Sequence, residues 1–316
     1  GYANRADRFL SGIGYIDDGS AAAIFSRGYY DRTAITAWKL INDELVMQWT
    51  FDAPDKSEYA GQGNHGLSIN DVDNDGYDEI VFAGLVLNNN GVPLVNTHWG
   101  HGDAMHVSDW NGDGKLEVYK VNEEHWGAGL YDPATGDILW FEDGSGDTGR
   151  GVAGDIDPRY EGAEMWHSID THTHDVEGNI IYEAKPSQNF SIYWDGDLLM
   201  ELFDSNNTEE LIPQVQKWDY ENLQTIVLLE AQGTKLNNGT KSNAGLVADL
   251  YGDWREEFIV RDKEDNNKIR IYSTTIGTEY VFPCLLEDKA YREGVAWQNT
   301  AYNQPANLPY LLKEPQ

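Results

Sequence analysis

The sequence predicts an all-β protein, built as a calcium-stabilised β-propeller. An acidic motif recurs along the chain, and its first aspartates are spaced by 54, 38, 46, 40 and 54 residues. These six anchors are Asp17, Asp71, Asp109, Asp155, Asp195 and Asp249. Hairpin patterns follow most anchors, and no long segment has the 3.6-residue apolar period of a helix. Repeats of this length with paired strands are typical of four-stranded propeller blades, so we expect residues 1–316 to form one propeller domain.

Three segments show the hairpin pattern most clearly. Each alternates apolar and polar residues, turns through polar residues, and then alternates again, as two paired strands do. They are ITAWKLINDELVMQW (35–49), GLYDPATGDILWF (129–141) and VQKWDYENLQTIVLL (215–229). A β-sandwich also has many short strands, so it is the spacing of the repeats that favours the propeller.

The composition excludes several classes of partner. The chain has 54 acidic and 22 basic residues, which gives a net charge of −32, and this charge repels nucleic acid and anionic membranes. No apolar run approaches the roughly 20 residues of a membrane span. Aromatic residues are abundant, with 11 Trp and 18 Tyr, so a packed core is expected. The single cysteine, Cys284, excludes an internal disulfide, and we expect it to be a small buried apolar side chain.

The first strong copy of the acidic motif, DVDNDGYDE, has the pattern of a calcium loop. Asp71, Asp73 and Asp75 stand at alternate positions, a glycine provides the turn, and Glu79 follows at position 9. Ca²⁺ takes about 6–8 oxygen ligands, and the backbone carbonyl of Tyr77 completes such a set. The repulsion among these carboxylates therefore has an explanation, which is that they share a cation.

Three further segments repeat the motif: DWNGDGKLE, DIDPRYEGAE and DLYGDWREE. Their predicted ligands are Asp109, Asn111, Asp113, Lys115 (through its carbonyl), Glu117, Asp155, Asp157, Glu164, Asp249, Asp253 and Glu257. A solvated acidic turn without an ion is the alternative, and it stays open above all for the copies that begin at Asp155 and Asp249. We expect several Ca²⁺ ions, each with a structural role.

Four side chains occupy one repeated position ahead of the anchors. His65, His101, Arg150 and Lys241 stand 5–8 residues before an anchor aspartate. In a propeller the equivalent segments of neighbouring blades meet at one face, so we expect the two imidazoles to converge and the four side chains to ring a cleft. A neutral imidazole can act as a general base, and the cations favour an anionic substrate. Structural histidines and surface ion pairs are the alternatives.

Two more histidines, His172 and His174, alternate along the chain as residues on one face of a strand do. We interpret them as part of an exposed hairpin, in preference to a transition-metal site.

Seven segments, in order, resemble the rhamnogalacturonan lyases of polysaccharide lyase family 11. They are YANRADRFLSGIGY, SRGYYDRTAITAW, YAGQGNHGLSINDVDNDGYDEI, GHGDAMHVSDWNGDG, GRGVAGDIDPRYEGAEMW, NNGTKSNAGLVADLYGDWREE and GVAWQNTAYNQP, and the resemblance runs from Tyr2 to about Pro305. It implies a secreted, calcium-rich, eight-bladed propeller that cleaves the rhamnose-galacturonate backbone of pectin (rhamnogalacturonan I) by β-elimination. It also implies cleft residues at His65, His101, Arg150 and Lys241, sugar contacts at Asn238, Gly239 and Thr240, and a tyrosine contact at Tyr302.

The chain departs from the family pattern at its start. Members of the family carry a long region before the YANR-like motif, whereas this sequence begins at that motif and shows six anchors where eight blades are expected. We therefore expect a monomer that is a fragment or a shortened propeller, or a ring completed by a polypeptide that carries the first blades.

The chemistry of uronates gives the expected mechanism. Ca²⁺ and Arg150 neutralise the galacturonate carboxylate, and a base removes the C5 proton while the oxygen at C4 departs. His65, His101 and Lys241 are all candidate bases, with His65 first because a free imidazole titrates at about 6.5. Endo and exo cleavage both stay open. The alternatives are a calcium-dependent module that only binds polysaccharide or protein, and a hydrolase with two carboxylates.

Overall fold

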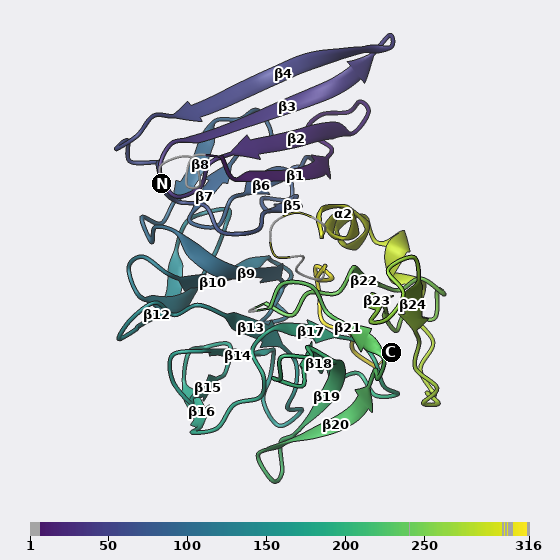
Figure 1. Ribbon diagram of the computed structural model, residues 1–316. Coiled ribbons are helices and arrows are strands. Elements are labelled where there is room, and N and C mark those ends of the chain that lie inside the picture. Colours follow the sequence, from purple (N-terminus) through teal and green to yellow (C-terminus); the bar gives the residue numbers. More distant parts are fainter. Residues whose placement is uncertain (1–6, 240, 299, 301, 303–305, 315–316) are drawn as a thin grey trace. The chain divides into compact units, whose positions relative to one another are not determined.

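The computed structural model describes residues 7–239, 241–298, 300, 302 and 306–314. It falls into two compact units (Figure 1). Unit 1 comprises Gly1–Val107 and Lys115–Gly149, and unit 2 comprises Ser108–Gly114 and Arg150–Gln316. The expectation of one domain for residues 1–316 stays a prediction, and each unit is described by itself below.

Unit 1 contains three four-stranded antiparallel sheets, each a meander of consecutive strands. The first has β1 (Phe9–Gly14), β2 (Ala22–Arg27), β3 (Thr33–Ile41) and β4 (Glu44–Ala53). The second has β5 (Ser68–Asn70), β6 (Glu79–Val81), β7 (Leu85–Leu87) and β8 (Pro93–Asn96). The third has β9 (Gly102–Ser108), β10 (Glu117–Asn122), β11 (Gly127–Tyr131) and β12 (Ile138–Asp143).

Unit 2 also contains three four-stranded sheets. The first has β13 (Gly151–Gly154), β14 (Glu164–His167), β15 (Thr173–His174) and β16 (Ile180–Tyr182), and the second has β17 (Phe190–Ile192), β18 (Glu201–Ser205), β19 (Pro213–Asp219) and β20 (Gln224–Glu230). The third has β21 (Thr234–Lys235), β22 (Leu246–Ala248), β23 (Glu257–Asp262) and β24 (Ile269–Tyr272). In that last sheet β23 lies at the centre and pairs with the other three strands.

The three predicted hairpins are confirmed, as the strand pairs β3–β4, β11–β12 and β19–β20. The first of them is the long hairpin drawn in purple in Figure 1. In five of the six sheets of the described residues, the register shifts by a residue between the third and fourth strands. Such a bulge increases the local twist. Its recurrence at one position shows that the sheets are structural repeats, as the spacing of the anchors predicted.

The apolar pattern of the strands decides which of them lie inside. Strands β9, β10 and β11 are buried at every residue, whereas the fourth strand β12 is exposed or half-buried throughout. In unit 1 a core forms between the second and third sheets around residues such as Val81, Val107 and Tyr131. In unit 2 one core centres on Trp166 and a second on Phe203 and Phe258.

The all-β prediction is confirmed, with one short helix among the strands. This helix, α2 (Lys289–Trp297), follows a single 3₁₀ turn, η1 (Leu285–Glu287). The Asp288 side chain caps α2 by accepting from the Tyr291 N–H at 2.9 Å, and the Tyr291 hydroxyl donates to Glu256 at 2.6 Å. The helix is therefore held by tertiary contacts, which a periodicity search over nine residues cannot detect. Neither helix of the described residues is long and apolar enough to cross a bilayer.

The expectation that Cys284 is a buried apolar side chain was wrong, because this side chain is only partly buried. It precedes η1 in a segment that leaves the last sheet, and its Sγ lies 3.8 Å from the Asp249 carbonyl oxygen. An edge position of this kind leaves one side of the thiol uncovered.

Candidate functional site

In the first five sheets the acidic anchor lies in the loop between the first and second strands, and in the last sheet Asp249 lies in the loop between β22 and β23. Except in the first sheet, the strand that follows this loop begins with a glutamate. These residues are Glu79, Glu117, Glu164 and Glu257, together with Glu201, which the sequence analysis did not assign. All five are nearly inaccessible. The repeat thus places a buried carboxylate under each loop except the one at Asp17.

In the Asp71 loop the carboxylates organise the backbone. Asp71 accepts from the N–H groups of Asp75 and Gly76 at 3.0 and 2.9 Å, and Glu79 accepts from Val72 at 3.1 Å. Oxygens of Asp71, Asp73 and Glu79 lie within 4.8 Å of one another. Burial raises the pKa of Glu79 to about 8. A Ca²⁺ ion fits this donor set, since all its groups are oxygen ligands.

The Asp109 loop repeats this turn. Asp109 accepts from the N–H groups of Gly112, Asp113 and Gly114 at 2.7–3.0 Å, and Asn111 accepts from Asp113 at 2.8 Å. Lys115, predicted through its carbonyl, is exposed. In the first loop the Tyr77 hydroxyl donates to Asp18 at 2.9 Å.

The two looser copies carry an arginine of their own. The Arg159 guanidinium donates to both oxygens of Asp157, at 2.8 and 2.5 Å, and Arg255 donates to Asp253 at 2.6 Å. Under these loops Glu164 and Glu257 accept from two backbone N–H groups each. Because a guanidinium already neutralises one acid, these two copies need a metal ion less than the Asp71 loop does.

In the Asp195 loop the cation is a lysine. The Lys217 ammonium, from the third strand β19, lies 2.5 Å from Asp195, 2.8 Å from Asp197 and 2.8 Å from Glu201. In the first sheet Lys39, also from the third strand, donates to Asp17 in the same way. The loops at Asp17 and Asp195 thus hold a lysine ammonium beside their carboxylates.

The predicted convergence of the two imidazoles in unit 1 is confirmed. A parallel bridge between Asn64 and Gly102 aligns the segment before β5 with the start of β9. This places the rings of His65 and His101 edge to face, with their centroids 4.9 Å apart. Both side chains are buried.

Tyrosines and carboxylates surround this imidazole pair. His65 Nδ1 lies 2.8 Å from the Tyr29 hydroxyl, and His65 Nε2 lies 3.0 Å from the Tyr30 hydroxyl and 3.2 Å from Asp103. His101 Nδ1 lies 2.5 Å from the Gly63 carbonyl oxygen. Burial lowers the pKa of His101 to about 3, so this ring is neutral at ordinary pH.

The contacts of His101 indicate a cation site. A carbonyl oxygen only accepts hydrogen bonds, so Nδ1 of the neutral ring carries the proton and Nε2 presents a lone pair. Nε2 has no hydrogen-bond partner among the described residues, yet it lies 3.2 Å from Glu123 Oε2, which also presents a lone pair. Two lone pairs at this distance repel unless a cation lies between them. Donor atoms of His65, His101, Asp103 and Glu123 all lie within 4.8 Å of one another, so the four side chains can hold a divalent ion.

A buried lysine supports the same segment. Lys120 of β10 is inaccessible, and its ammonium donates to the Gly100 carbonyl at 2.9 Å. Burial lowers the pKa of Lys120 to about 7. Lys120 therefore positions the backbone that carries His101.

Unit 2 gathers the remaining predicted side chains around Tyr302. The Arg150 guanidinium lies 5.9 Å from the centre of the Tyr302 ring, and the Lys241 ammonium lies 4.8 Å from it. Asn189 fixes Arg150, with its side-chain oxygen at 3.2 Å and its carbonyl at 3.1 Å from the guanidinium. Asn189 in turn donates to the buried Asp204 at 2.7 Å. Three residues predicted from separate motifs thus share one neighbourhood.

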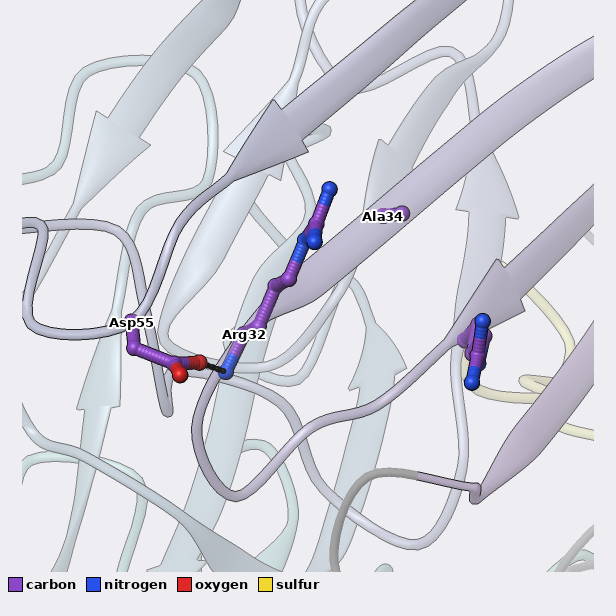
Figure 2. Close-up of a pocket in the computed structure, with 4 residues that line it drawn as sticks. Arg32, Ala34 and Asp55 are labelled. Atoms are coloured by element: carbon purple, nitrogen blue, oxygen red, sulfur yellow. Dashed lines mark hydrogen bonds between the residues drawn. The ribbon is translucent and has the colours of Figure 1, made fainter.

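The predicted sugar-contacting residues Asn238 and Gly239 line an open pocket of about 600 Å³ in unit 2. Lys235 and Arg261 add positive charge to its wall, which suits an anionic ligand. Thr240 lies outside the described residues. A second pocket, of about 270 Å³, lies in unit 1 between Arg27, Arg32, Ala34 and Asp55, where the Arg32 N–H donates to Asp55 at 3.0 Å (Figure 2). None of the predicted site residues lines this second pocket.

The interpretation of His172 and His174 as an exposed hairpin was wrong. His174 is only 2% accessible and His172 is half-buried. The two residues also differ in place: His174 belongs to β15, which pairs with β14 and β16, whereas His172 lies in the preceding loop.

Several contacts of the site were missed by sequence reasoning. These are Tyr29, Tyr30, Asp103, Glu123 and Asn189. Asp103 carried a usable signal, since it stands two positions after His101, as residues on one face of a strand do. Glu123 follows β10 and Asn189 precedes β17, and neither residue stands in a sequence pattern that predicts its contact.

Gly102 sets how closely the start of β9 approaches β10. A Cβ at this position would lie 2.1 Å from the Val121 carbonyl oxygen and 3.0 Å from Asn122 Cα, both backbone atoms. We expect Gly102→Ala to lower the free energy of unfolding by about 1–3 kcal/mol, because the backbone must move to accept it. Urea unfolding measures this. Gly277→Ala is the control, since a Cβ there meets nothing within 4 Å, and equal losses for the two variants would contradict the prediction.

Comparison with known proteins shows similarity over the whole chain. The family model described as rhamnogalacturonan lyase family 11, C-terminal domain, matches residues 1–315. The rhamnogalacturonan exolyase YesX of Bacillus subtilis is 44% identical over 328 residues, covering 99% of this chain and 53% of the relative. The endolyase YesW of the same organism is 45% identical over 318 residues, covering 98% and 50%. The crystal structure of YesW matches with a TM-score of 0.93 at 44% identity, covering 100% of this chain and 54% of that one. The chain thus spans about half the length of the curated relatives it matches.

Proposed function

The chain belongs to rhamnogalacturonan lyase family 11, and from this premise we propose that it acts in the β-elimination of rhamnogalacturonan I. The observation that carries the proposal is the imidazole and carboxylate cluster of His65, His101, Asp103 and Glu123. A buried neutral histidine facing a carboxylate has the donors for a divalent ion, and a uronate substrate needs such charge. The relatives carry the names of both exolyase and endolyase, so the proposal extends to the reaction and not to the cleavage mode.

We assign a separate role in the elimination to each predicted site residue. Arg150, held by Asn189, neutralises the galacturonate carboxylate and so makes the C5 proton more acidic. In unit 1 the cluster of His65, His101, Asp103 and Glu123 would hold a divalent ion, which would supply positive charge for a uronate carboxylate. Nitrogens of His65 and His101 that held such an ion would not accept a proton, so we assign proton abstraction to Lys241 of unit 2, which would act as the neutral amine. Tyr302, with Asn238 and Gly239, orients the sugar.

We also propose that the six sheets are propeller blades stabilised by Ca²⁺. The four-stranded meander of the first five sheets, their recurring bulge and the acidic loop in every sheet support this arrangement. The Asp71 and Asp109 loops are the calcium sites with the best donor sets, followed by those at Asp155 and Asp249. We propose that the protein is secreted, because its pectin substrate is extracellular. We also propose that it is a monomer or is completed by a polypeptide with further blades.

The test of the function is an ultraviolet assay. The chain is incubated with rhamnogalacturonan I and Ca²⁺, and absorbance of the unsaturated uronate product is followed, with a chelator control. We expect a calcium-dependent rise. A folded chain that gives no rise, alone or together with the N-terminal half of YesW, would contradict the proposal. If that chain still binds the polysaccharide, the non-catalytic binding module is the correct reading.

A further inference from the structure

A second group of histidines lies in unit 2, on the sheet β13–β16. His167 ends β14, His174 belongs to β15, and Asp170 and His172 lie in the loop between these strands. The side chains of His167 and His174 are buried, at 1% and 2% accessibility. None of these four residues has a part in the proposed elimination.

The four side chains are neighbours. Asp170 Oδ2 lies 3.5 Å from His167 Nε2 and 3.9 Å from His172 Nδ1. The His174 ring centre lies 6.2 Å from the centres of both His167 and His172, nearly parallel to the first and perpendicular to the second. One carboxylate oxygen is therefore within reach of two imidazoles, and the third imidazole packs beside both.

This donor set has a specific chemistry. Zn²⁺ binds imidazole nitrogen at about 2.0–2.1 Å and carboxylate oxygen at about 2.0–2.2 Å, so its ligand atoms lie on the order of 3–4 Å apart. The two distances to Asp170 fall in this range. Imidazole ligands select transition metals over Ca²⁺, which prefers oxygen. The acidic loops of this chain offer oxygen donors only, so the histidine group differs from them in kind.

We propose that His167, Asp170, His172 and His174 form a binding site for a transition-metal ion of the Zn²⁺ type. The site has a structural reason to exist at this position. Strand β15 is only two residues long and pairs with β14 through two residue pairs, Met165 with His174 and Trp166 with Thr173. An ion bound by residues of β14, of β15 and of the loop between them ties this short strand to its neighbour.

The surroundings tolerate the added charge. The Lys185 ammonium donates to the His167 carbonyl oxygen, on the backbone side of the residue. Burial lowers the pKa of Lys185, with Asp170 opposing that effect. Asp170 supplies one negative charge within the group itself.

The experiment uses Co²⁺ as a probe, in the presence of excess Ca²⁺ so that the oxygen-rich loops are filled. A tetrahedral Co²⁺ site with nitrogen donors absorbs strongly in the visible range, whereas octahedral Co²⁺ absorbs weakly. We expect His172→Ala and Asp170→Asn to bind one Co²⁺ fewer per chain than the unaltered protein and to lose this absorption. We also expect Zn²⁺ to raise the melting temperature of the unaltered protein but not of His172→Ala.

His125→Asn is the matched control. His125 is an exposed histidine whose left-handed backbone, with φ of 51°, asparagine accepts readily. The variants at 170 and 172 alter partly exposed side chains, so loss of folding does not confound the result. Binding at the cluster around His101 is separated by His101→Asn, which leaves the unit 2 site intact. Equal Co²⁺ binding by His172→Ala, Asp170→Asn and the unaltered protein would overturn the proposal, whatever the lyase assay shows.

Discussion

His101→Asn is expected to lower kcat/KM for rhamnogalacturonan by about 10²–10³-fold and to remove one divalent ion from the protein. The asparagine amide reaches the position of Nδ1 and keeps the donor to the Gly63 carbonyl, whereas Nε2, the atom that faces Glu123, is lost. Because the ring is neutral and buried, the fold loses no charge. Activity and ion content are measured together, by product absorbance and by metal analysis after dialysis.

The two readouts separate the roles that His101 can have. If His101 holds an ion, activity and ion content fall together, and a higher concentration of the ion restores part of the activity. If His101 is the base, the ion stays and activity is lost at every concentration, which would refute our assignment of Lys241. His125→Asn, the same change at an exposed site, should alter neither quantity.

Lys217→Met should lower the free energy of unfolding by about 3–5 kcal/mol in the presence of a chelator. This is the expected cost of removing one partner from a buried charge cluster. The lysine is 21% exposed and contacts three carboxylates, of which that of Glu201 is inaccessible. Burial already raises the pKa of Glu201, and removing the ammonium takes away the main effect that opposes burial. Denaturant unfolding with EDTA measures the loss.

Added Ca²⁺ should restore most of that stability in Lys217→Met, because the vacated loop then has three carboxylates and no cation of its own. The control is Lys268→Met, whose lysine is 67% exposed and pairs with a single acid, and which should be nearly neutral. A loss in Lys217→Met that Ca²⁺ does not reverse would show that the Asp195 loop cannot take a metal ion. Calcium binding by the unaltered Asp195 loop, detected as one ion fewer in Asp197→Asn, would show that the lysine does not replace the metal.

The repeat made much of the fold predictable. Alternation in segments such as 215–229 is a local property, so the hairpin β19–β20 follows from it directly. The pairing of His65 with His101 was predictable for another reason, since both precede a strong acidic loop and equivalent positions of neighbouring repeats come together. Regular spacing thus carried information about contacts between residues 36 positions apart.

The rest depended on contacts that spacing does not encode. Lys217 lies 22 residues after Asp195, in β19, and no residue near the acidic motif indicates that a lysine contacts it. Tyr29 and Tyr30 come from the β2–β3 connection, far in sequence from the histidines they contact. The burial of His174 depends on what covers that face of the sheet, which the local sequence does not encode.

The lysines of the first and fifth sheets have a consequence for what happens when calcium is scarce. A cation that is part of the chain cannot diffuse away, so the Asp17 and Asp195 loops keep their neutralising charge at any calcium concentration. The Asp71 loop has no such reserve in its carboxylate cluster, and its acids repel one another once the ion leaves. Calcium depletion should therefore open the molecule in a fixed order, with amide protons of β5–β6 exchanging before those of β17–β18. The protein would then respond to falling calcium in steps. Repeats that bind a metal ion would lose stability first, and repeats that contain a lysine would keep theirs.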